Sequence, residues 1–170
     1  MALSFVTSTD IEVDVVVTCD PAVEATLDER AAYLQSGDLE DLGTVGDDAT
    51  RFTIRALSPA ERERAEIAAG AYTRSELGRL LWIEAPTGTQ ERARWHHELE
   101  DDERGALAQY NEYLNRVYIE MIREALVAID GEEKHVETLN RIRPDENRTQ
   151  TISELVLHIQ RLSLLDSSGK

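Results

Sequence analysis

The residues from Arg51 to Glu66, RFTIRALSPAERERAE, constrain the fold more than any other part of the chain. In its first part the apolar side chains of Phe52, Ile54 and Ala56 alternate with polar ones. This alternation is typical of a half-buried strand. Ser58 then provides a helix cap, and Glu61 completes a capping box around Pro59, which takes the first helical position. The pattern predicts a strand over 51–57 that leads directly into a capped helix.

A second alternating segment, EVDVVVTC at residues 12–19, predicts another strand near 11–19. A further strand over 3–7 also fits the pattern. The two clear strands can pair in parallel through a crossover, or antiparallel within a small sheet. The sequence leaves both arrangements open.

Helical spacing predicts several helices around these strands. The first covers 22–34, with a buried stripe formed by Val23, Leu27, Ala31 and Leu34. An irregular loop that contains one short turn is expected over 37–50, because glycines and acids are frequent there. Two more helices are expected over 59–72 and 76–83.

The longest helical pattern lies between residues 90 and 129, which include one glycine and no proline. Its apolar residues recur at three- and four-residue steps: Leu107, Tyr110, Leu114, Val117, Met121 and Ala125. They predict a long amphipathic helix near 102–129, with 90–100 either continuing it or forming a helix of its own. A polar helix over 132–143 is expected to end at Pro144.

The C-terminal segment predicts a polar linker over 144–150, followed by an amphipathic helix. Thr151 and Glu154 have the spacing of a capping box. The wide apolar face of this helix must pack on the core of the chain itself or on another subunit. The candidate interface residues on this face are Leu155, Val156, Ile159 and Leu162.

Together these patterns predict an α+β fold that is predominantly helical, in which a small N-terminal β element packs with a helical bundle. We divide the chain into an acidic, strand-containing region over 1–57, a helical core over 58–143, and a linker with the C-terminal helix over 144–170. At 170 residues this organisation corresponds to one domain with an appended helix.

Negative charge is concentrated near the N-terminus. Residues 1–50 carry 12 acids and one base, whereas residues 51–143 carry 18 acids and 14 bases. The formal net charge of −16 repels phosphate backbones, so we expect no direct binding of nucleic acid. The acidic block fits a solvated surface better than a docking surface for a basic partner. No stretch reaches the ~20 apolar residues that span a bilayer, so we expect no membrane insertion.

No motif in the sequence points to catalysis. His96 and His97 precede an acidic run, but adjacent histidines on a helix point about 100° apart, whereas chelation from one face needs positions i and i+4. Cys19 is interpreted as a small apolar group and His158 as a residue at the boundary of the core. Glycine-rich phosphate loops and the nucleophile elbow are absent. We therefore expect no catalytic residue, no metal and no cofactor, and interpret the chain as an interaction protein; a small enzyme or nucleotide-binding domain is the disfavoured alternative.

Two segments resemble small assembly proteins of tailed bacteriophages. They are RFTIRALSPAERE with the acidic, arginine-rich helix after it, and ISELVLHIQRLSLL at 152–165. The most similar class is the tail assembly chaperones. The resemblance implies a non-catalytic protein that binds the tape measure protein in the host cytoplasm while the tail is built. The alternative is a structural virion subunit, associated with the capsid or with the head-to-tail joint, that contacts neighbouring virion subunits. Self-association is compatible with either.

Overall fold

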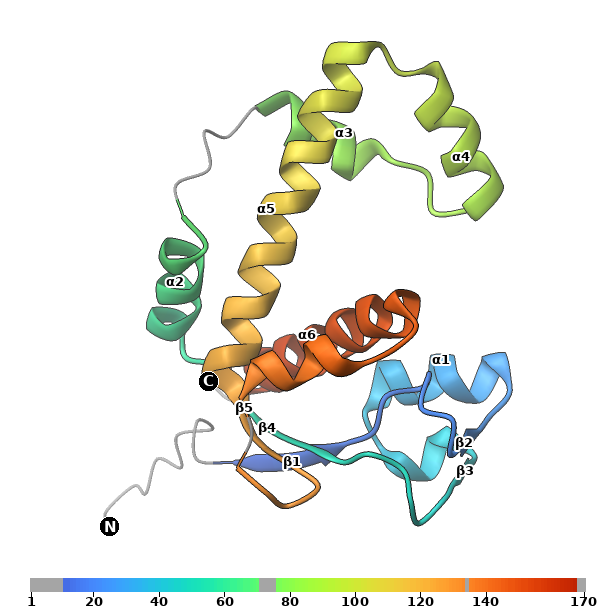
Figure 1. The fold of residues 1–170 in the computed structure, drawn as a ribbon, viewed down its shortest axis with the longest axis vertical. Coiled ribbons are helices and arrows are strands. Elements are labelled where there is room, and N and C mark those ends of the chain that lie inside the picture. The colour runs from blue at the N-terminus through green and yellow to red at the C-terminus, as the bar shows by residue number, and fades with distance from the viewer. Residues whose placement is uncertain (1–10, 71–75, 134, 168–170) are drawn as a thin grey trace. The chain divides into compact units, whose positions relative to one another are not determined.

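The computed structural model describes residues 11–70, 76–133 and 135–167 (Figure 1). The chain forms two compact units, one made of residues 1–65 and 118–170 and the other of residues 66–117. The fold is α+β and predominantly helical, as the sequence predicts. The strand predicted over 3–7 lies outside the described residues.

An antiparallel sheet of three strands belongs to the first unit. Its order is β1 (Glu12–Val15), β4 (Phe52–Arg55) and β5 (Leu126–Ile129). Of the two arrangements that the sequence left open, the antiparallel one is therefore correct. A smaller antiparallel pair joins β2 (Val23–Glu24) to β3 (Thr44–Val45).

The predicted junction between strand and capped helix is confirmed. Phe52 and Ile54 are buried, and α2 (Pro59–Ala68) follows the strand. The Ser58 N–H donates to Glu61 Oε2 at 2.8 Å, and the Glu61 N–H donates to Ser58 Oγ at 3.3 Å. These two bonds satisfy backbone donors that the first turn of a helix leaves free.

The helix predicted over 22–34 is wrong at its start, because β2 occupies its first residues and α1 covers Leu27–Ser36. Thr26 caps α1: the Glu29 N–H donates to its hydroxyl at 3.3 Å, and its own N–H donates to Glu29 Oε2 at 2.7 Å. The predicted stripe is also wrong, since Leu27 is 84% exposed whereas Tyr33 is fully buried. The loop that follows holds a short 3-10 helix, η2 (Leu39–Leu42).

The long helix is real but shorter than predicted. Helix α5 covers Asp101–Ala125, and the predicted last turn is strand β5. Leu126 to Ile129 are apolar throughout, so their sequence is compatible with a strand and with a last turn of α5. They form a strand because they pair with β4. Residues 90–100 largely form a helix of their own, α4 (Thr89–Glu98).

Two predictions about the C-terminal third are wrong. The polar helix over 132–143 is a short 3-10 helix, η3 (Val136–Arg141). The linker over 144–150 does not exist, because α6 begins at Asp145 and continues to Ser167. Helix α6 contacts α1, β4 and η3, and so contributes to the core of the first unit.

Candidate functional site

The predicted interface residues lie mostly inside the first unit. Leu155 and Ile159 are fully buried, Val156 is 3% exposed and Leu162 is half-buried. The chain's own residues therefore cover this face of α6. Of the two roles left open by the sequence, closing the core is the one that the burial supports.

A polar cluster ties the interior of α6 to Thr18, in the turn that follows β1. The Glu154 carboxylate, 5% exposed, accepts the Thr18 N–H and the Thr18 hydroxyl, both at 2.6 Å, and the Gln150 amide at 2.8 Å. Bonds to a carboxylate are short and strong, and they compensate for its burial. The spacing of Thr151 and Glu154 imitates a capping box, but both residues lie inside α6 and contact Cys19 and Thr18 of the turn after β1.

His158 is buried rather than at the boundary that the sequence suggested. Its side chain is fully buried, and neither ring nitrogen has a hydrogen-bond partner in the described part of the chain. The ring contacts Tyr33, with centroids 5.0 Å apart. Burial, and then the charge of Arg161, lower the pKa of His158 to about 4. The imidazole is therefore uncharged at neutral pH, and its role is packing.

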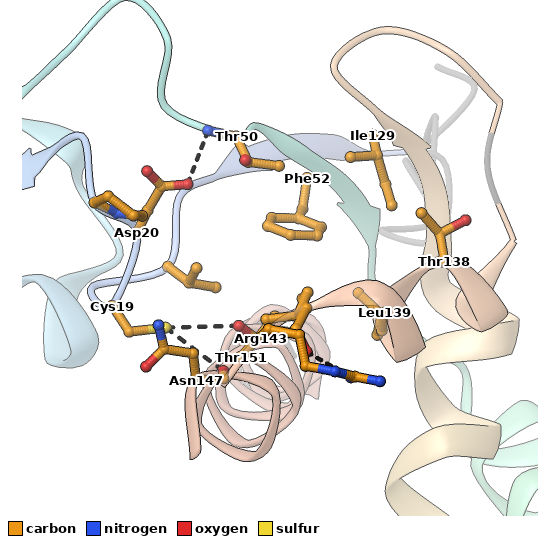
Figure 2. A pocket seen from close by; sticks show the side chains of 13 residues that line it. Cys19, Asp20, Thr50, Phe52, Ile129, Thr138, Leu139, Arg143, Asn147 and Thr151 are labelled. Carbon is orange, nitrogen blue, oxygen red and sulfur yellow. Dashed lines mark hydrogen bonds between the residues drawn. The ribbon is translucent and has the colours of Figure 1, made fainter. Parts of the chain in front are cut away.

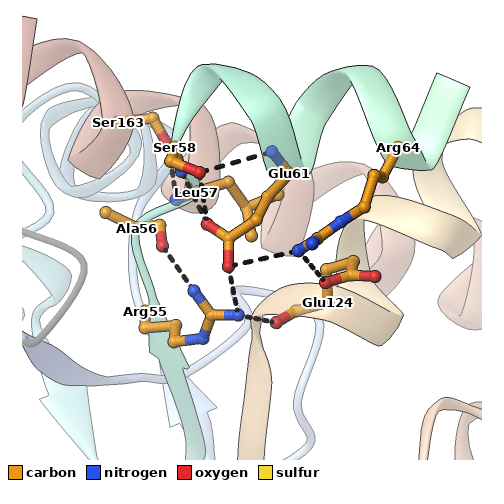
Figure 3. A network of polar contacts seen from close by, with 8 residues as sticks. All are labelled: Arg55, Ala56, Leu57, Ser58, Glu61, Arg64, Glu124 and Ser163. Atoms are coloured by element: carbon orange, nitrogen blue, oxygen red, sulfur yellow. Dashed lines mark hydrogen bonds and ion pairs between the residues drawn. The ribbon is translucent and has the colours of Figure 1, made fainter.

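Charged residues of the first unit form a second cluster beside the capped start of α2 (Figure 3). Arg55 lies 2.9 Å from Glu61 and donates to the Glu124 carbonyl at 2.7 Å, while Arg64 lies 3.4 Å from the Glu124 carboxylate. Partial burial alone would raise the pKa of Glu61, but the bonds from Arg55 and Ser58 outweigh it and lower that pKa to about 2. All these contacts stabilise the junction between strand and helix.

A cavity of about 240 Å³ opens in the first unit beside Cys19 (Figure 2). The Cys19 sulfur lies 3.7 Å from the Asn147 carbonyl and 3.6 Å from the Thr151 hydroxyl. Burial raises the pKa of the Cys19 thiol, which therefore stays protonated at neutral pH. The sequence indicated a small apolar group at this position, whereas the thiol is half-buried and has polar neighbours. The sequence gave no sign that a cavity adjoins it.

Helix α3 (Glu76–Glu84), in the second unit, carries apolar side chains both on a covered side and on an exposed side. One face is covered: Leu81 is 7% exposed and belongs to a cluster with Leu99, Leu107 and Trp95. The other face carries three exposed side chains, Leu77 at 40%, Leu80 at 42% and Ile83 at 58%. We call these three residues the α3 face.

Gly78 brings α3 very close to α5. A Cβ atom at this position would lie 2.9 Å from the Ala106 carbonyl carbon, and closer still to its oxygen. The covered face is therefore fixed by backbone contact as well as by the Leu81 cluster. The sequence predicted α3 but did not identify its second face, although the absence of charge between Leu80 and Ile83 was a signal.

The described residues contain neither a group of metal-ligand side chains nor a helix that could span a membrane. No three His, Cys, Asp or Glu side chains among them gather into a group that could hold a metal ion. His96 and His97 are both exposed on α4. Within the same ranges, no helix is long and apolar enough to cross a membrane.

Comparison with known proteins adds no relative: no protein-family model, no curated protein and no solved structure matches the chain.

Proposed function

We propose that the protein is a non-catalytic assembly protein of a tailed bacteriophage that acts through protein contacts in the host cytoplasm, most simply as a tail assembly chaperone for the tape measure protein. The observation that carries the protein-contact part is the α3 face, which is apolar and exposed. The phage part depends on the resemblance of residues 51–63 and 152–165 to that class.

The physical argument concerns the exposed side of α3. A surface helix normally has a polar outer side, whereas α3 exposes three large apolar side chains beside the charged residues Glu76 and Glu84. Leu77, Leu80 and Ile83 follow one another at three-residue steps, which is the arrangement of anchors in helix-and-groove recognition. Covering the exposed part of each side chain would contribute about 1 kcal/mol. The α3 face therefore has the chemistry of a binding surface for another protein.

The surrounding charges suggest which partner surface fits. Residues 66–117 carry ten acids and six bases, so the second unit has an excess of negative charge. Oppositely charged rims speed association and favour the correct partner. The partner segment that fits best is an amphipathic helix with an apolar centre and basic flanking residues.

Co-purification tests this proposal. The chain is co-expressed with a tagged tape measure protein, which the proposal expects to be encoded immediately downstream. Leu80→Asp combined with Ile83→Asp should lower binding at least tenfold, because two carboxylates would lose water on association. The matched control is Leu27→Asp in α1, where the side chain is 84% exposed, and it should bind as the wild type does. Equal binding by the wild type and the double variant would exclude the α3 face as the binding surface.

Purified virions distinguish a chaperone from a structural subunit. A chaperone leaves after the tail is built, so mass spectrometry should find no copies of the chain in mature particles. A stoichiometric amount would instead identify a virion subunit. If the isolated wild type is a dimer and the double variant a monomer, a second copy covers the α3 face, and the tape measure partner is wrong.

A further inference from the structure

We propose that the cavity beside Cys19 binds a small uncharged molecule that has an apolar body of one or two rings and a hydrogen-bonding group, such as a phenol or an indole. The cavity lies entirely within the first unit, and the α3 face takes no part in it. The inference is therefore independent of the proposed function.

The size of the cavity sets the size of the ligand. Its volume is about 240 Å³. An apolar protein cavity of about 150 Å³ is large enough for benzene. The larger volume here admits a bicyclic ring, or a single ring with a short substituent.

Apolar side chains, several of them from the sheet and from η3, form part of its wall. In Figure 2, Phe52 and Ile129 extend from the sheet toward Leu139 of η3. Val17, Phe52, Ile129 and Leu139 are each at most 6% exposed. Side chains held this firmly form a preformed surface, which reduces the entropy lost when a ligand binds. Pro21 and Arg143 also line the cavity and are exposed, so the cavity reaches the protein surface beside them.

The charged groups in the wall are already engaged. The Asp20 carboxylate accepts the Ala22 N–H at 2.9 Å and the Thr50 N–H at 3.1 Å. Arg143 donates to the carbonyls of Asn140 and Ile142, both at 2.9 Å. A charged ligand would lose water in an apolar space without gaining a dedicated counter-charge, which is unfavourable. An uncharged ligand avoids this cost.

Uncharged polar groups remain for the ligand to use. The Thr50 and Thr138 hydroxyls and the Asn147 side-chain amide line the cavity and are half-buried. None of the three bonds through its side chain to another residue of the described ranges. Hydroxyls and amides both donate and accept hydrogen bonds, so they match the O–H of a phenol or the N–H of an indole.

NMR titration of the full chain with indole and with phenol tests the proposal. We expect saturable shifts of the Thr50, Ile129 and Leu139 amide signals, with a Kd of about 0.1–1 mM for a ligand of this size. Shifts that do not saturate, or that cluster on α3, would overturn it. Tryptamine and indole-3-acetate carry opposite charges and should each bind at least tenfold more weakly than indole. Equal or tighter binding of either would overturn the uncharged class.

A variant whose larger side chain fills the cavity provides a second test of the proposal. Ile142 is half-buried at the cavity edge, so Ile142→Phe should occupy the space and weaken indole binding at least tenfold. The matched control is Leu157→Phe on α6, where the side chain is 41% exposed and does not line the cavity; its indole affinity should stay at the wild-type value. Wild-type affinity in a folded Ile142→Phe variant would place indole elsewhere and overturn the proposal. The titrations with tryptamine and indole-3-acetate use the wild type, so those titrations do not depend on the folding of any variant.

Discussion

Helices α6 and α3 both carry wide apolar faces, yet the chain buries one and leaves the other exposed. Leu155 and Ile159 of α6 are fully buried, whereas Leu80 and Ile83 of α3 are 42% and 58% exposed. Polar ties from the helix interior accompany the burial of α6. Glu154 binds Thr18 of a distant segment, and the Leu57 N–H donates to the hydroxyl of Ser163 at 3.0 Å. Interior polar groups with partners in other elements thus help to fix the face of α6 that the chain covers itself.

The largest effect should come from placing charge on each face in turn. Leu155→Asp with Ile159→Asp would bury two carboxylates without partners, and should unfold the first unit by removing roughly 5 kcal/mol or more. Leu80→Asp with Ile83→Asp should change the free energy of unfolding by less than about 1 kcal/mol, because these side chains reach water. Circular dichroism and NMR signal dispersion show whether each of the two double variants is folded.

Under the other role that the sequence leaves open, in which the α6 face packs on another subunit, the α6 double variant would stay a folded monomer and only fail to assemble. A folded α6 double variant would show that the two faces do not differ as the burial indicates. Both tryptophans, Trp82 and Trp95, belong to the second unit, so their fluorescence reports separately on that unit in each variant.

Acid should lower the free energy of unfolding of the first unit through His158, which lies on α6. Its pKa is about 4 in the folded chain against 6.5 for the free side chain, so the unfolded chain binds more protons between these values. The stability that the neutral imidazole contributes is complete above pH 6.5 and is lost as the pH falls toward 4. The expected loss is about 3 kcal/mol. Tyr33 and Arg161 face the ring, and neither is a carboxylate that could stabilise the protonated, charged form of His158.

Urea unfolding of the wild type and of His158→Leu at pH 7, 6, 5 and 4 measures this loss. Carboxylates titrate in both proteins, so the difference between the two curves isolates the histidine. The His158→Leu curve should be flatter by about 3 kcal/mol across the range. Parallel curves would mean that His158 takes up its proton in the folded state, and that the interior of α6 is more open to water than its burial indicates.

The sequence predicted those elements whose signals are local. The strand and the capping box at Ser58 depend on neighbours within a few residues, and both were correct. The first turns of α6 and the end of α5 have partners far along the chain, namely Thr18 for Gln150 and strand β4 for Leu126 to Ile129. The cavity was invisible for the same reason, since Val17, Phe52 and Leu139 meet only in the folded chain. Apolar periodicity located the α6 face but not the α3 face, and it could not show that the chain itself would cover α6.

The smallest effect tests whether the covered side of α3 is as tightly fixed as that of α6. A Cβ at Gly78 would press on the Ala106 carbonyl, so Gly78→Ala should push α3 away from α5 despite the better helix propensity of alanine. We expect the second unit to lose about 2 kcal/mol, measured by urea unfolding with tryptophan fluorescence. Gly105→Ala in α5 is the matched control, because a Cβ there meets no atom within 4 Å, and it should gain up to about 1 kcal/mol. Opposite signs for the two variants would show that backbone contact holds the inner side of α3. If both substitutions are stabilising, α3 is not held in one position on α5, and its covered side can become exposed to solvent.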